Sequence, residues 1–172
     1  MKNKFLPIFI TSIFIIFFIF FYKGLQNTNI YIPEKKINNK VPLFDGNLFY
    51  SVEKINSSNL FKSDKFYLLN IWSSWCAPCR KEHGLLMKLK ENKKLEVVGI
   101  NYKDTKINAN SFLNELGNPY DKIIFDQEGI ISIEWGAYGV PESFLIKDRI
   151  IIKRYIGPLN KKLIEEMRLI IK

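Results

Sequence analysis

Cys76 and Cys79 are the only cysteines in this chain of 172 residues, and their spacing favours redox chemistry. They follow an apolar segment typical of a buried strand, and Cys76 falls where a helix is expected to begin. Unpaired N–H groups and the dipole at a helix N-terminus stabilise a thiolate, so we expect Cys76 to be the attacking nucleophile. Cys79, one turn later, would resolve the mixed disulfide, and Pro78 stiffens the loop between the sulfurs without costing the first turn a hydrogen bond. A structural cysteine pair or half of a zinc site is the alternative, and Trp75 with the strand-to-helix context favours the redox pair.

His83 is the only histidine and lies four residues after Cys79, on the same helical face. A copper site built from Cys76, Cys79 and His83 is conceivable, because thiolates and imidazole suit Cu(I). His83 would start from within the helix, turned away from the exposed edge of the motif, so a packing or capping role is favoured. Two cysteines and one histidine are too few for a four-ligand zinc site of these types. We therefore expect no metal, and no cofactor other than the redox-active pair Cys76–Cys79.

The composition indicates one folded domain with an appendage. Hydrophobic residues make up 47% of the chain and charged residues 25%, which is enough apolar material for a core. The net charge is +9, but only four of the 26 basic residues are arginine, and none form an Arg-rich groove or a basic helix. We expect a solvated basic surface and no nucleic-acid partner. Aromatic residues such as Trp72, Trp135, Tyr138 and Phe144 are expected in the core or lining a groove.

The N-terminus carries an uncharged apolar run from residue 5 to residue 22, of 18 residues. At ~1.5 Å per residue such a helix just crosses a hydrocarbon core of ~30 Å. Residues 22–26 offer no small-x-small cleavage site, so an uncleaved anchor is favoured over a signal peptide. The positive-inside count barely discriminates, but a short N-terminal tail before the bulk of the chain is the usual signal-anchor geometry. The sequence thus predicts a cytoplasmic tail (1–4), a transmembrane anchor (5–22), a linker (23–40) and a folded domain (41–172).

The folded domain shows an alternation of strands and helices. A buried strand over 65–72, a helix of about four turns after Pro78 and a second strand over 95–102 form a right-handed βαβ unit with parallel strands. A short helix over 112–116, stopped by Gly-Asn-Pro, precedes a strand over 123–125, a helical turn over 130–135, a hairpin of strands 143–147 and 150–155, and a final helix over 160–172. This order predicts an α/β domain with a mixed sheet and helices on both sides.

Several segments carry a resemblance to a known family. Trp75-Cys76-Ala77-Pro78-Cys79, with Gly139-Val140-Pro141 further on, resembles the thioredoxin fold. The stretches 68–72, 79–83, 97–104, 112–120 and 138–146 are similar to the CcmG/DsbE proteins of cytochrome c maturation, and the similarity covers about residues 41–160. The Cys-x-x-Cys alone specifies only the superfamily, whereas Asn-Tyr-Lys-Asp and Gly-Asn-Pro-Tyr narrow it to the subfamily.

The resemblance implies a membrane-anchored reductant of the bacterial inner membrane, with its catalytic domain in the periplasm. A transmembrane electron donor of the CcdA/DsbD type would keep it reduced, and its client would be an apocytochrome c Cys-x-x-Cys-His segment or a cytochrome c maturation component that handles it. The alternatives are a general TlpA/ResA-like reductant with another client, a copper-binding chaperone that uses the cysteine pair as ligands, and a structural tether with an inert pair.

The resemblance also implies a substrate groove and the geometry of one peptide bond. Val140–Pro141 should be a cis peptide that faces Cys76, and the backbone of Val140 should pair with a substrate strand. From the residues alone, an ordinary turn proline is favoured, since few X-Pro bonds are cis. The groove would be lined by Trp75, Ala77, Pro78, Glu82, Tyr138 and Val140, with Pro141 counted among the catalytic residues.

Asn70 stands where thioredoxins usually have a buried Asp that assists proton transfer at the resolving cysteine. Asn cannot titrate, so another acid must take that role, and Glu142 beside Pro141 is the first candidate. The resemblance places Glu82 and Glu142 together in an acidic groove, although Glu82 could equally lie on a solvated helix face. A carboxylate near Cys76 would raise its thiol pKa and favour a reductant, so Glu142→Gln is expected to lower that pKa.

Overall fold

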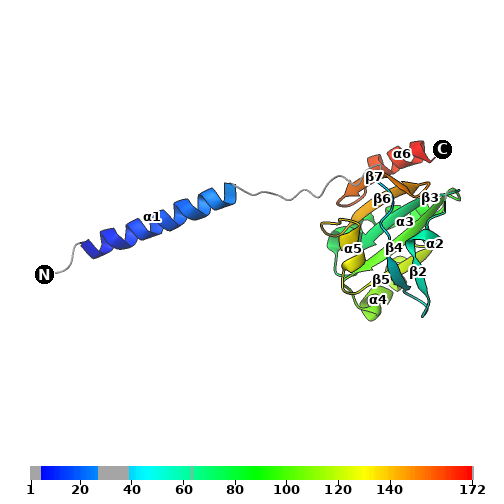
Figure 1. The fold of residues 1–172 in the computed structure, drawn as a ribbon, viewed down its shortest axis with the longest axis horizontal. Coiled ribbons are helices and arrows are strands. Elements are labelled where there is room, and N and C mark those ends of the chain that lie inside the picture. Colours follow the sequence, from blue (N-terminus) through cyan, green and yellow to red (C-terminus); the bar gives the residue numbers. More distant parts are fainter. Residues whose placement is uncertain (1–4, 27–38, 63, 172) are drawn as a thin grey trace. The chain divides into compact units, whose positions relative to one another are not determined.

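The computed structural model describes residues 5–26, 39–62 and 64–171. The chain divides into two compact units, Met1–Glu34 and Lys35–Lys172 (Figure 1). The predicted cytoplasmic tail (1–4) and most of the predicted linker (27–38) lie outside the described residues.

In the first unit, α1 (Phe5–Gln26) is one continuous helix. Its window Pro7–Gly24 has a mean hydropathy of 2.0, so the helix is long and apolar enough to cross a membrane. The hydroxyls of Thr11 and Ser12 donate to carbonyls three or four residues earlier, which satisfies the polar atoms of the apolar run within the helix itself. The helix continues four residues beyond the apolar run predicted from the sequence.

The second unit is built on a mixed sheet of seven strands in the order β2-β1-β5-β4-β3-β6-β7. The central strands β3, β4 and β5 are parallel, while β1, β2, β6 and β7 join through antiparallel pairs. The strands are β1 (Asp45–Leu48), β2 (Lys54–Asn56), β3 (Phe66–Trp72), β4 (Leu95–Tyr102), β5 (Lys122–Asp126), β6 (Glu142–Lys147) and β7 (Ile150–Ile156). This confirms the predicted mixed α/β sheet.

Helices cover both faces of the sheet (Figure 1). The helices are α2 (Ser57–Leu60), α3 (Ala77–Lys90), α4 (Lys106–Leu116), α5 (Ile130–Glu134) and α6 (Lys161–Ile170). Side chains of α3, α4 and α6 pack with Leu68 and Trp72 into one core, and we call this side of the sheet the α3 face. Side chains at the ends of α2 and α5 pack with Leu69 and Ile71 into a second core, on the α5 face. Because successive strand residues point to opposite faces, β3 feeds both cores.

The sequence missed the N-terminal hairpin of β1 and β2, and the short helix α2. Those strands are four and three residues long, contain Asp, Asn and Lys, and are largely exposed, so they lack an apolar run. The predicted β6–β7 hairpin is confirmed, and its turn residues Asp148 and Arg149 adopt φ of 52° and 62°. Positive φ at both turn positions is the geometry that the more usual Asn-Gly supplies.

Candidate active site

The cysteine pair lies at the junction of β3 and α3. Cys76 is the N-cap of α3, and its Sγ accepts a hydrogen bond of 3.1 Å from the Cys79 N–H. The two cysteines form a disulfide with 5.3 Å between their Cα atoms. Pro78 occupies the first turn of α3, as expected. Both cysteines are 3% exposed, so position at the helix end, and not exposure, distinguishes Cys76 from Cys79 in this oxidised form.

The segment that leads into Cys76 is held by the loop that follows β4. Asp104 is buried, and its carboxylate accepts hydrogen bonds from the Ser74 N–H at 2.7 Å and the Ser74 hydroxyl at 2.8 Å. Trp75 Nε1 donates to the Lys103 carbonyl at 3.0 Å, and the φ of Lys103 is 44°. Asp104 was not predicted as a site residue, although it ends the Asn-Tyr-Lys-Asp stretch. Asp104 therefore fixes the approach of the chain to the reactive sulfur.

The predicted groove residues divide into exposed and buried ones. Trp75 is 58% exposed and Tyr138 45% exposed, and Ala77 and Pro78 are exposed beside Cys76. Val140 is partly buried and packs against the cluster that contains both cysteines. The Val140–Pro141 peptide bond is cis, as the resemblance implied, and Pro141 is buried.

Glu82 is buried on the α3 face, 1% exposed, and not on a solvated helix surface. Its Oε1 accepts a hydrogen bond from Asn70 Nδ2 at 2.9 Å, and its Oε2 accepts one from the Leu159 N–H at 2.6 Å. Burial raises the pKa of Glu82 from 4.5 to about 7, against the lowering effect of these two hydrogen bonds. Since Glu82 follows Cys79 by one helical turn on the same buried face, it can gain or lose a proton near neutral pH close to the resolving cysteine.

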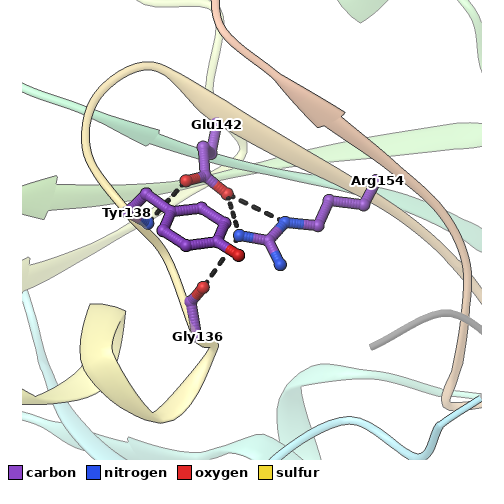
Figure 2. A network of polar contacts seen from close by, with 4 residues as sticks. All are labelled: Gly136, Tyr138, Glu142 and Arg154. Carbon is purple, nitrogen blue, oxygen red and sulfur yellow. Dashed lines mark hydrogen bonds and ion pairs between the residues drawn. The ribbon is translucent and has the colours of Figure 1, made fainter. Parts of the chain in front are cut away.

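Glu142 lies in a different environment, an ion pair with Arg154 of β7 (Figure 2). Arg154 donates to Glu142 Oε2 from Nε at 3.0 Å and from a terminal nitrogen at 2.7 Å, and that nitrogen also donates to the Gly136 carbonyl at 2.8 Å. Glu142 Oε1 accepts from the Tyr138 N–H at 2.6 Å, and the guanidinium lies 4.7 Å from the centre of the Tyr138 ring. The side chains of Arg154 and Glu142 are 5% and 1% exposed. The pair thus clamps the loop that carries Val140–Pro141.

The structure corrects the expectation that Glu82 and Glu142 share one acidic groove. Glu142 alternates with Phe144 and Ile146, which belong to the core of the α5 face, whereas Glu82 lies on the α3 face. The carboxylate of Glu142 is also balanced by a buried guanidinium, so it has little net charge to project onto Cys76. Of the two predicted acids, Glu82 is therefore the one suited to proton transfer at the cysteine pair.

His83 caps a neighbouring helix, as predicted. It is 2% exposed, and its Nε2 lies 2.8 Å from the carbonyl of Gly117, the C-cap residue of α4. Burial lowers the pKa of His83. Among the residues that the structure describes, no group of three or more His, Cys, Asp or Glu side chains is placed to hold a metal ion.

Comparisons with known proteins agree with this geometry. The family described as Redoxin matches residues 36–168. The chain is 40% identical over 131 residues to the thiol:disulfide interchange protein DsbE of Escherichia coli, which covers 76% of this chain and 70% of that protein. It is 48% identical over 95 residues to the thiol:disulfide interchange protein CycY of Rhizobium leguminosarum, and this match covers 55% of this chain and 51% of that relative. A crystal structure of a DsbE-type protein from Chlorobium tepidum superposes with a TM-score of 0.64 at 23% identity, over 79% of this chain and 98% of that one, which shows the shared fold.

Proposed function

The chain belongs to the redoxin family and, within it, to the thiol:disulfide interchange proteins of the DsbE type, and from this premise we propose that it reduces disulfides during cytochrome c maturation. It is a thiol:disulfide oxidoreductase whose redox group is the pair Cys76–Cys79. The observation that carries the order of the chemistry, with Cys76 as the attacking sulfur, is the placement of Cys76 at the N-cap of α3. The proposed direction, reduction of the client, rests on the similarity to the DsbE proteins.

The proposed reaction is a dithiol–disulfide exchange in two steps. In the reduced protein the Cys76 thiolate attacks one sulfur of the client disulfide, which forms a mixed disulfide and releases the first client thiolate. Cys79 then loses its proton and attacks Cys76 Sγ, which forms the Cys76–Cys79 disulfide and releases the second client thiolate. The client gains two electrons and the protein loses two. The proton of Cys79 leaves with the second step, and the two released client thiolates take up protons from water. The cysteine pair itself is the redox group, so we propose no further cofactor.

We propose that Glu82 accepts the proton of Cys79 in the second step. An acid whose pKa is about 7 is half ionised at neutral pH, which suits both proton uptake and proton return. Asn70, at the position where thioredoxins have Asp, takes part as a hydrogen-bond donor to Glu82 instead of as an acid.

The proposed groove for the client segment is formed by the exposed residues beside the disulfide. Trp75 and Tyr138 offer apolar contact area, and Ala77 and Pro78 are exposed in the loop beside Cys76. The backbone of Val140, next to Pro141, would pair with the incoming strand. The clamp by Glu142 and Arg154 supports this loop from the other side of the sheet.

We propose that α1 anchors the protein in the bacterial inner membrane as a single pass, with the globular unit in the periplasm. The helix has the required length and hydropathy, and residues 1–4, 23–40 and 41–172 would form the cytoplasmic tail, the linker and the catalytic domain. A periplasmic reductant needs electrons from across the membrane, and a donor of the CcdA/DsbD type would supply them. The client would be apocytochrome c or the maturation component that handles it.

The experiment that tests this proposal uses the full chain in detergent micelles and an oxidised Cys-x-x-Cys-His peptide. Cys79→Ser should trap a mixed disulfide through Cys76, and Cys76→Ser should trap none. A reduction potential near or below about −270 mV supports a dedicated reductant, whereas a value near about −120 mV means a disulfide donor and overturns the proposal. Reduction of unrelated protein disulfides as fast as of this peptide would instead support a general reductant. Loss of thiol reactivity with one Cu(I) bound and no turnover would support a copper chaperone.

A further inference from the structure

Beneath the cysteine pair, Asn70 is the centre of a buried hydrogen-bond network on the α3 face. It is 0% exposed, and its Nδ2 donates to Glu82 at 2.9 Å and to the Ser143 hydroxyl at 3.0 Å. Its Oδ1 accepts from the Tyr120 hydroxyl at 2.8 Å. Tyr120 comes from the Gly-Asn-Pro-Tyr stretch after α4, 50 positions after Asn70. Its hydroxyl binds the same amide group that donates to Glu82.

The chemistry of the partners fixes the direction of these bonds. An ionised carboxylate only accepts hydrogen bonds, so Asn70 must present its NH2 group to Glu82. The Asn70 carbonyl then points to Tyr120, whose hydroxyl donates. The second oxygen of Glu82 accepts from the Leu159 N–H, a backbone donor that cannot reverse. Turning the Asn70 amide around would bring its carbonyl to Glu82 and take the acceptor away from the Tyr120 hydroxyl proton.

Packing holds the Tyr120 ring in place for this bond. Tyr120 is 3% exposed and stacks on Trp72, with ring centroids 5.3 Å apart and an angle of 17° between the planes. Gly99 of β4 leaves the space for the stack, because a Cβ at that position would lie 2.8 Å from Trp72 Nε1 and 2.9 Å from Tyr120 Cδ1. The hydroxyl is therefore aimed at Asn70 by a rigid aromatic pair.

We infer that Tyr120 is a positioning residue for the exchange reaction: it holds the Asn70 carbonyl, keeps the Asn70 NH2 group on Glu82, and thereby sets the pH at which Glu82 passes from proton acceptor to proton donor. The inference rests on the proposed proton-transfer role of Glu82. The Gly-Asn-Pro-Tyr stretch, which carries part of the family resemblance, thereby also takes part in the chemistry.

The surroundings of Glu82 make the hydrogen bond from Asn70 one of the main influences on the pKa of Glu82. From β3 it meets neutral Asn70, from the segment before α6 it meets the Leu159 N–H, and on its own helix Cys79 lies one turn away. Tyr120 is the titratable neighbour from the segment after α4, and burial followed by the charge of Glu82 raises the pKa of Tyr120 well above 10.0, so its hydroxyl stays protonated. Glu82 forms no ion pair within the described part of the chain. Arg154 lies on the α5 face, where it pairs with Glu142. Burial and two hydrogen bonds thus determine the pKa of Glu82.

The test measures the ionisation of Glu82 directly, in the oxidised full chain in detergent micelles labelled with ¹³C at the glutamate carboxyls. The resonance of Glu82 is assigned by its loss in Glu82→Gln. Tyr120→Phe removes the hydroxyl that orients Asn70, so the midpoint of the Glu82 titration should rise by about one pH unit, a tenfold change in proton affinity. Tyr155→Phe is the matched control: Tyr155 is also buried on the α3 face, and its hydroxyl has no hydrogen-bond partner among the described residues, so the midpoint should not move.

A second variant keeps the test valid if Tyr120→Phe does not fold. Tyr120→3-fluorotyrosine keeps the shape of the ring but makes the hydroxyl a stronger donor, so the Glu82 midpoint should fall. The pH profile of reduction of the Cys-x-x-Cys-His peptide should move in the same direction as the midpoint in each variant. An unchanged midpoint in folded Tyr120→Phe or in Tyr120→3-fluorotyrosine would overturn the inference. A wild-type protein that fails to reduce the peptide would instead overturn the proposed function, while the carboxyl titration would still report on Tyr120.

Discussion

Raising the pH from 5 to 8 should remove the contribution of Glu82 to the stability of the oxidised protein, because folding buries its carboxyl group. The pKa of Glu82 is 4.5 in an unfolded chain and about 7 in the folded protein. Between these values the folded state binds the extra proton, so the free energy of unfolding falls as the pH rises. The stability associated with Glu82 is fully present below about pH 4.5 and is lost as the pH passes through about 7.

The size of the effect follows from the two pKa values. At 1.36 kcal/mol per pH unit, the difference between 4.5 and about 7 corresponds to about 3 kcal/mol at full ionisation. This is a large share of the ~5–15 kcal/mol by which domains of this kind are stable. Gln at position 82 cannot ionise, so the part of the slope that Glu82 contributes should disappear in Glu82→Gln. It should also carry a pH-independent loss of about 1–3 kcal/mol, because an amide NH2 group would face either Asn70 Nδ2 or the Leu159 N–H.

The assay is guanidinium denaturation of the full chain in detergent micelles at several pH values, followed by tryptophan fluorescence. All three tryptophans, Trp72, Trp75 and Trp135, lie in the globular unit, so the signal reports its unfolding. The quantity of interest is the difference between wild type and Glu82→Gln, which removes the contribution of other titrating groups. Glu165→Gln, an exposed carboxylate, is the control and should keep the wild-type slope. A difference that stays constant between pH 5 and 8 would refute the assignment of a near-neutral pKa to Glu82.

Three further changes test the parts of the site that position it. Arg154→Met leaves Glu142 buried and unpaired and should cost about 3–5 kcal/mol of unfolding free energy, most of it regained when Glu142→Gln is added; a loss below about 1 kcal/mol would contradict a charged pair. Asp104→Asn weakens the grip on Ser74 and should slow peptide reduction about tenfold with a smaller effect on stability, and an unchanged rate would remove Asp104 from the site. Gly99→Ala forces a Cβ into the aromatic stack and should cost about 1–3 kcal/mol in the same denaturation assay, so a neutral result would mean that the stack can shift.

The sequence predicted the frame of the site because local patterns determine it. The apolar run of β3, the position of Pro78 in the next turn and the second apolar run of β4 each carry a signal within a few residues. They were enough to place Cys76 at a helix start and to predict parallel neighbours. The hairpin β1–β2 was missed because its strands are short and polar, and β1 joins the sheet by pairing with β5, a contact that is distant in sequence.

The roles of the two acids could not be predicted in the same way. Whether a carboxylate near the motif is free, paired or raised in pKa depends on partners far along the chain. Arg154 neutralises Glu142 from the neighbouring strand. Leu159, 77 residues after Glu82, supplies one of the two hydrogen-bond donors to the Glu82 carboxylate. Proximity to Pro141 suggested Glu142, but proximity in sequence says nothing about the face of the sheet on which a side chain lies.

The register between β3 and β6 is what gives the two acids separate tasks. Asn70 pairs with Ser143, so Ser143 points to the α3 face and joins the network of Glu82. Its neighbour Glu142 must then point to the α5 face, where Arg154 holds it and the loop before Pro141 is fastened. A slip of one residue in this pairing would exchange the two, and would place an unpaired carboxylate beside Asn70 and a serine opposite Arg154. Proton transfer at the cysteines and support of the substrate loop are therefore separated by one residue along β6. The site requires Glu142 and Ser143 in this order, because each must face its own side of the sheet.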